Sequence, residues 1–225
     1  HVPTTAASGG GVAYMAHISG IAFSSSTTSA TSAGTNGSHC YIGYNHIKNT
    51  TGSGGAYYCL TVVGASDSNV IAYNHLENHY YYGMYINGAT GTQILHNEIE
   101  RSTKTTVTTF YGIYTTGTTP GTQIVGNRLH DPYGGTGTST STFYGIMSYG
   151  DGTATDPVLI ANNAFYNINQ GGSVYGMYVS TAPYVLIYHN TINIDQSLSS
   201  SSTNYGLYSS GTNTGTEIKN NNISI

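Results

Sequence analysis

Charged and imidazole side chains recur at two fixed positions behind an asparagine that itself recurs along the chain. In the first four copies, the residue directly after this Asn is His46, His75, Glu98 or Arg128, and the residue two positions further on is Lys48, Glu77, Glu100 or His130. If the copies stack, Glu77 and Glu100 become neighbours. Two close carboxylates raise the pKa of one member, so that one serves as an acid and the other as a base, as in glycoside hydrolysis.

This face therefore supplies the candidate catalytic residues of a carbohydrate-active enzyme, which are Glu77, Glu98, Glu100, His75 and Arg128. The favoured interpretation is a solvated charged face with cross-strand pairs Lys48–Glu77 and Glu98–Arg128. His46 and His75 could share a metal ion. No orienting carboxylate is expected beside their imidazoles, however, so the sequence predicts no metal site and no cofactor.

A repeat must position these residues. The hexad Ile-x-x-Asn-x-(Ile/Leu/Phe) occurs seven times, and its Asn residues, 23 to 36 positions apart, are Asn45, Asn74, Asn97, Asn127, Asn163, Asn190 and Asn221. Tyr-Gly-(Ile/Met/Leu)-(Tyr/Met) precedes five of the hexads. Short alternating strands separated by Gly, Ser, Thr and Asn, without a helical segment, fit one coil of a parallel β-helix with a rise of about 4.8 Å.

We therefore predict an all-β fold, a right-handed parallel β-helix of about seven coils that forms a single domain over residues 1–225. The hexad Ile and the Met, Ile or Leu of the second motif point inward as apolar stacks. The recurring Asn lies at a turn, where its amide tolerates unusual backbone dihedrals and bonds to the equivalent Asn of the next coil, which makes an Asn ladder.

Tyrosines are the second group of candidate binding residues. Tyr85, Tyr114, Tyr178 and Tyr208 end the second motif and are expected to point outward, where they stack either on sugar rings or on each other. The first Tyr of the motif, as in Tyr82, is expected to point inward.

The composition excludes other classes of function. Only 6% of the 225 residues are charged, against about 25% in an average soluble protein. Five Lys and Arg residues cannot neutralise a phosphate backbone, so no nucleic-acid partner is expected. No apolar run approaches about 18 residues, so no membrane span is expected. The start at His1 has no signal-peptide pattern, which indicates a processed chain or a piece of a longer one.

The two motifs resemble the right-handed parallel β-helix repeat of the pectate-lyase-like proteins. The segment 185–193, VLIYHNTIN, is also similar to repeats of large secreted surface proteins of Bacteroidota-type bacteria. This resemblance covers essentially the whole chain and implies an extracellular or cell-surface location. The Asp clusters of the lyases and the Asn-Thr-Asp and Gly-His-Gly segments of the polygalacturonases are absent, which argues against these two activities.

The ends of the chain favour self-association. The last coil carries Ile218, Ile223 and Ile225 without a polar cap, and an uncapped parallel edge pairs with another chain. We expect head-to-tail contact between these residues and His1, Val2 and Pro3. The predicted function is a structural β-helical subunit, or a segment of a longer solenoid, in a surface fibre, sheath or adhesin stalk. The alternative is a β-helix that cleaves or binds a polysaccharide.

Overall fold

Three parallel β-sheets, each of seven strands, form the molecule. A computed structural model describes residues 19–26, 29–34, 37–52, 54–134, 139–169, 172–195 and 203–225. No helix occurs within these ranges, and none of the described segments could therefore cross a membrane as an apolar helix.

Each sheet takes one strand from every coil. Sheet A contains β1 (Ser19–Phe23), β4 (Tyr58–Val63), β7 (Tyr82–Asn87), β10 (Phe110–Thr118), β13 (Phe143–Asp151), β16 (Val174–Ser180) and β19 (Asn204–Ser210). Sheet B contains β2 (Tyr41–Gly43), β5 (Val70–Ala72), β8 (Gln93–Leu95), β11 (Gln123–Val125), β14 (Val158–Ala161), β17 (Val185–Tyr188) and β20 (Glu217–Lys219). Sheet C contains β3 (His46–Lys48), β6 (His75–Glu77), β9 (Glu98–Glu100), β12 (Arg128–His130), β15 (Ala164–Ile168), β18 (Thr191–Ile194) and β21 (Asn222–Ser224).

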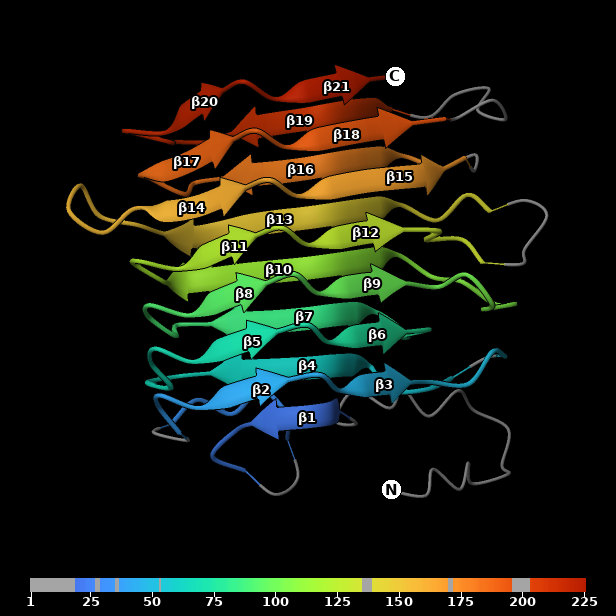
Figure 1. Ribbon diagram of the computed structural model, residues 1–225, viewed down its shortest axis with the longest axis horizontal. Coiled ribbons are helices and arrows are strands. Elements are labelled where there is room, and N and C mark those ends of the chain that lie inside the picture. Colours follow the sequence, from blue (N-terminus) through green and yellow to red (C-terminus); the bar gives the residue numbers. More distant parts are fainter. Residues whose placement is uncertain are drawn as a thin grey trace.

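The path of the chain confirms the predicted parallel β-helix. In Figure 1 the chain climbs from bottom to top, running rightward through sheets B and C in front and leftward through sheet A behind them. This path is a right-handed coil. Equivalent residues of successive hexads are direct strand partners, as in Ile94 with Ile124 and Ile99 with Leu129.

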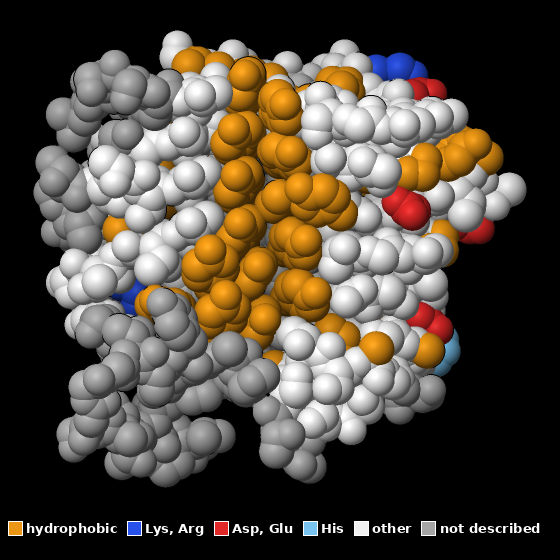
Figure 2. Space-filling model, turned by 180° about the vertical axis from the view of Figure 1, so that it is seen from behind, with side chains coloured by type: hydrophobic (Ala, Val, Ile, Leu, Met, Phe, Trp, Pro, Cys, Tyr) orange, Lys and Arg blue, Asp and Glu red, His pale blue; other side chains and the backbone are white. Residues whose placement is uncertain are grey.

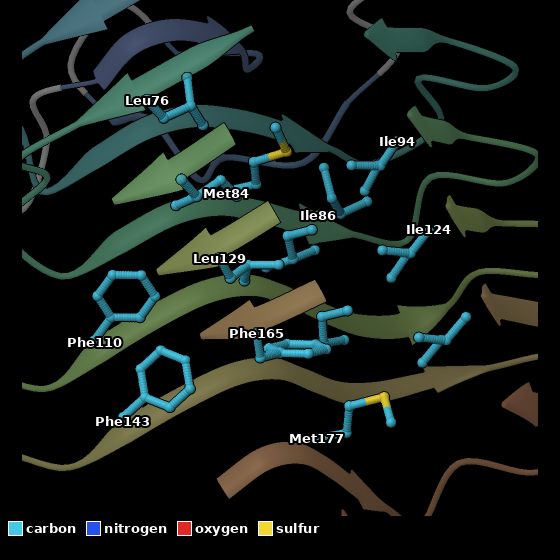
Figure 3. Packing of buried hydrophobic residues seen from close by; sticks show 14 of the residues in the cluster. Leu76, Met84, Ile86, Ile94, Phe110, Ile124, Leu129, Phe143, Phe165 and Met177 are labelled. Atoms are coloured by element: carbon cyan, nitrogen blue, oxygen red, sulfur yellow. The ribbon is translucent and has the colours of Figure 1, made fainter. Parts of the chain in front are cut away.

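The interior holds the apolar stacks that the hexad predicts. Ile71, Ile94 and Ile124 of sheet B, and Leu76 and Leu129 of sheet C, have no exposed surface. Figure 3 shows four of these side chains meeting Met84 and Ile86 of sheet A in the middle of the coil, with Phe110 and Phe143 side by side at its edge; the four are Ile94, Ile124, Leu76 and Leu129. The sequence periodicity thus specifies a continuous core in which each coil buries its neighbour's apolar side chains.

The Asn ladder is also confirmed, although its backbone geometry differs from the expectation. Six side-chain bonds of 2.9–3.0 Å join the seven Asn residues, each Nδ2 donating to the Oδ1 of the next coil's Asn. The left-handed backbone conformation falls on the preceding residue, with φ of 57° at Tyr44, 57° at Tyr73 and 52° at His96. The prediction that the Asn itself takes the unusual dihedral is therefore wrong, and its selection reflects the ladder.

The Tyr-Gly motif contains a local irregularity that turns two tyrosines to the same face. Tyr111 and Tyr114 lie three residues apart, yet their rings meet edge to face at 5.9 Å outside the coil. Between them, Gly112 and Ile113 both face inward. A Cβ at Gly112 would lie 2.2 Å from Leu129 Cδ2 and 2.5 Å from the Gly145 carbonyl oxygen, so only glycine fits there.

Candidate functional site

The charged residues gather on the outer face of sheet C, across β3, β6, β9 and β12. The strand register places His46 beside His75, Lys48 beside Glu77, Glu77 beside Glu100, and Glu98 beside Arg128. The two predicted ion pairs form, because Lys48 Nζ lies 2.9 Å from Glu77 Oε1 and Arg128 donates to Glu98 Oε2 over 2.9 Å. We call this set of residues the charged face.

Diagonal contacts between coils, which strand register alone does not predict, link the same residues. His46 Nε2 lies 3.0 Å from Glu77 Oε2, His75 Nε2 lies 3.0 Å from Glu100 Oε1, and His130 Nε2 lies 2.9 Å from Glu98 Oε1. In each case the position after the Asn meets the position two residues further on in the next coil. A search for opposite charges along this diagonal would have found the three pairs.

The electrostatics of Glu77 do not suit a general acid. Burial raises the pKa of its carboxyl group, but the hydrogen bonds from Lys48 and His46 lower that pKa by more, so the net shift is downward. A general acid at neutral pH needs the opposite shift. Glu98 shows the same balance, with burial opposed by the hydrogen bond from His130 and the charge of Arg128. The acid–base role of this face stays a prediction.

His130 and Glu100 each have two polar partners. His130 Nδ1 lies 2.6 Å from Asp131 Oδ2, and its ring stacks on Tyr166 with 4.6 Å between centroids. Glu100 is 4% exposed and accepts from the backbone N–H of Ser102 in addition to His75. Every carboxylate of the charged face is thus engaged by a neighbouring side chain, as in a structural network.

Two further basic side chains lie away from the charged face, although they come directly after β9 in the sequence. Arg101 and Lys104 have no exposed surface. Lys104 Nζ donates to the backbone carbonyls of Thr50, Gly52 and Gly54 over 3.0–3.3 Å. Arg101 donates to the carbonyls of residues 79–81 and 108–109. These two residues fix the loops between sheets C and A, a function that their sequence neighbourhood did not indicate.

The tyrosines form two parallel columns on the outer face of sheet A, visible as the paired vertical bands in Figure 2. One column contains the predicted Tyr85, Tyr114, Tyr178 and Tyr208, with Met147 at the equivalent position of β13. The other contains Tyr58, Tyr82, Tyr111, Tyr144, Tyr175 and Tyr205. The expectation that the first Tyr of the motif points inward is wrong, because the irregularity at the Gly returns it to the outer face.

Ring stacking determines what these columns offer to a ligand. Tyr111 stacks on Tyr82 at 4.8 Å and on Tyr144 at 5.0 Å, with interplanar angles of 18° and 4°. Tyr85 stacks on Tyr114 at 5.4 Å and 7°. Both faces of an interior ring such as Tyr111 are therefore covered, and only ring edges and hydroxyls reach solvent. A sugar that stacks on aromatic rings needs an open ring face, which the column of Tyr111 does not offer. Carbohydrate binding by Tyr85, Tyr114, Tyr178 and Tyr208 stays a prediction.

The chain ends give partial information on the predicted assembly surfaces. Ile218, Ile223 and Ile225 are 50%, 42% and 69% exposed. His1, Val2 and Pro3 lie outside the described residues.

One group in the described part of the chain combines three metal-ligating side chains. The ligand atoms of His46, His75 and Glu77 all lie within 4.8 Å of one another. The sequence predicts no metal site at this His pair because no carboxylate is expected beside it, whereas β6 places Glu77 on the same face as His75.

Comparisons with protein-family models, with curated proteins and with solved structures find no match to this chain. The parallel β-helix is thus established by the structure, while the similarity to bacterial surface repeats stays a resemblance.

Proposed function

We propose that this chain is a structural module of an extracellular or cell-surface fibre, sheath or stalk, in which copies stack head to tail and continue the β-helix. The recurring residues of the repeat serve to stack one coil on the next. Ile fills the core, Asn forms the ladder and Tyr forms the outer columns. An extracellular location follows from the resemblance to secreted surface repeats.

The observation that carries the proposal is the complementarity of the first and last rungs of the Asn ladder. In interior rungs, the backbone N–H and Nδ2 of each Asn donate to the Oδ1 of the next Asn, as Asn97 does to Asn127 at 2.9 and 3.0 Å. Within the described residues, the backbone N–H of Asn221 has no such acceptor and the Oδ1 of Asn45 has no donor. A second copy placed on β21 through its own β3 would join these groups.

Apolar side chains at the same edge support this contact. Ile187 and Ile192 are 0% and 1% exposed because another coil lies over them. Their partners in the last coil, Ile218 and Ile223, are about half exposed. Covering these residues with another coil removes apolar surface from water and pairs the open strand edges of β19, β20 and β21.

The low charge also favours stacking. Five cationic and nine acidic residues give a formal net charge of −4 over 225 residues. Repulsion between copies that approach along a common axis is correspondingly weak.

The test is electron microscopy and light scattering of the native protein over a range of concentrations, with two single variants. The wild-type chain is expected to form rods with an axial repeat of about 4.8 Å. Ile223→Lys places a charge on the exposed edge and is expected to stop elongation. Thr191→Lys adds the same charge to the side of the rod, where Thr191 is exposed on β18, and is expected to leave elongation intact.

Two results would contradict the proposal. One is a wild-type chain that stays monomeric at tens of micromolar, the range in which open parallel edges should pair. The other is elongation of the Ile223→Lys variant to the same extent as the Thr191→Lys variant.

A further inference from the structure

A compact group of nitrogen and oxygen ligands lies at the first two coils of the charged face. His46 of β3 is the direct strand partner of His75 of β6. Their imidazole rings are parallel within 4° and 4.5 Å apart. Glu77 lies two residues after His75 on the same strand and therefore projects from the same face. The three residues thus occupy three corners of a four-residue patch on two adjacent strands.

The two imidazoles are oriented alike. His46 Nε2 faces Glu77 Oε2 at 3.0 Å, and His75 Nε2 faces Glu100 Oε1 at 3.0 Å. One ring nitrogen of each imidazole and a Glu77 oxygen lie within 4.8 Å of one another. Ligand atoms that bind one ion at about 2.0–2.2 Å are separated by less than this distance, so a modest rotation of the side chains brings them together.

The carboxylate of this group is fixed in advance. The side chain of Glu77 is 6% exposed. Its Oε1 accepts from Thr103 Oγ1 at 3.2 Å and from Asn78 Nδ2 at 3.3 Å, which leaves Oε2 directed at His46. Hydrogen bonds of this kind orient metal-binding carboxylates and reduce the entropy lost when the ion binds.

Lys48 occupies the fourth corner, and its Nζ lies 2.9 Å from Glu77 Oε1. The Lys48 side chain is 56% exposed, so it can turn into solvent when another cation takes the carboxylate. The position of this ammonium group shows that the patch already attracts positive charge. It also lowers the affinity for a second cation, since the two charges repel.

We propose that His46, His75 and Glu77 form a binding site for a first-row transition-metal dication, with Zn²⁺ as the representative ion. Two imidazoles and one carboxylate suit Zn²⁺, Cu²⁺ or Ni²⁺, whereas Mg²⁺ and Ca²⁺ prefer sites made of oxygen ligands alone. Three protein ligands leave the fourth position of a tetrahedral ion for water. The ion would join β3 to β6 and fasten the first coil to the second.

The test is a titration of the full chain with ZnCl₂, followed by calorimetry and by competition with a chromogenic chelator. The wild type is expected to bind one Zn²⁺ per chain. His75→Asn is expected to weaken binding at least ~10-fold, since it removes one of three ligands. His96→Asn is the matched control, because His96 is exposed, lies outside the group and has a positive φ that Asn accepts.

A second variant is expected to bind Zn²⁺ more tightly, which misfolding could not explain. Lys48→Gln removes the competing ammonium group and is expected to tighten Zn²⁺ binding by ~3- to 10-fold. The proposal is overturned if the wild type takes up no Zn²⁺ at millimolar concentration. It is equally overturned if His75→Asn binds as tightly as His96→Asn, or if Ca²⁺ competes as strongly as Cu²⁺.

Discussion

Replacing Asn127 with alanine should strongly destabilise the protein, because this side chain lies in the middle of the ladder. Its Oδ1 accepts from the backbone N–H and the Nδ2 of Asn97, and its Nδ2 donates to the Ile94 carbonyl and to Asn163 Oδ1. All four bonds are 2.9–3.0 Å long and buried. Alanine removes all of them.

The loss in free energy of unfolding depends on which hydrogen-bond partners of Asn127 keep a second hydrogen bond in the variant. Asn97 Nδ2 still donates to the Ile71 carbonyl, and Asn163 Oδ1 still accepts from the backbone N–H of residue 127. The backbone N–H of Asn97 loses its acceptor inside the protein, and an unpaired buried donor costs about 1–3 kcal/mol. With about 1 kcal/mol for each of the three other bonds, the free energy of unfolding should fall by about 4–6 kcal/mol.

The assay is urea denaturation followed by circular dichroism, in protein dilute enough to prevent stacking of copies. Asn221→Ala is the matched control, because it removes the same group from the last rung, where water replaces the lost bonds. We expect this control to cost about 1 kcal/mol. If Asn127→Ala costs no more than Asn221→Ala, the ladder does not stabilise the coil stack and the reasoning fails.

Three further predictions concern the loops, the charged face and the tyrosine columns. Lys104→Met leaves three backbone carbonyls of the loop before β4 without their donor and should lower the free energy of unfolding by about 2–4 kcal/mol, measured by urea denaturation; no loss would mean that the loop is fixed by other contacts. Because the folded-state pKa of Glu98 lies below its ordinary value, the stabilisation it provides is present above that value and is lost as the pH falls through the folded-state pKa. The urea midpoint should accordingly drop between neutral and acidic pH, and Glu98→Gln should flatten this part of the profile, whereas an unchanged slope would exclude the assigned role. Tyr111→Phe should leave the thermal midpoint nearly unchanged while Tyr111→Ala lowers the free energy of unfolding by about 2 kcal/mol, because stacking depends on the ring; equal effects would assign the stability to the hydroxyl.

The sequence predicted those features that repeat with the coil. The hexad fixes which side chains meet between coils, because parallel in-register strands place equal positions together. Ile94 against Ile124 and Asn97 against Asn127 follow from the spacing alone. The same logic placed Lys48 beside Glu77.

The features that were missed depend on local geometry within a coil. The outward position of Tyr82 requires the irregularity at the following glycine, and a strict two-residue alternation predicts the opposite face. The diagonal from His46 to Glu77 depends on the reach of two side chains in addition to the register. Arg101 and Lys104 are buried, where they donate to backbone carbonyls of loops outside the repeat. The periodicity of the repeat does not predict the paths of these loops.

The recurrence of the hexad in every coil creates an ambiguity for the folding chain. A strand that pairs one coil too early or too late would still find Ile opposite Ile and Asn opposite Asn, so these columns barely distinguish correct from shifted alignments. The charged face does distinguish the two alignments. If β6 took the place of β9, Glu77 would lie beside His130 of β12 and would lose its ion pair with Lys48. The charged residues of β3, β6, β9 and β12 differ from coil to coil more than the Ile and Asn columns do, and they therefore favour the correct alignment of the first coils. Refolding after their neutralisation should populate misaligned, kinetically trapped states.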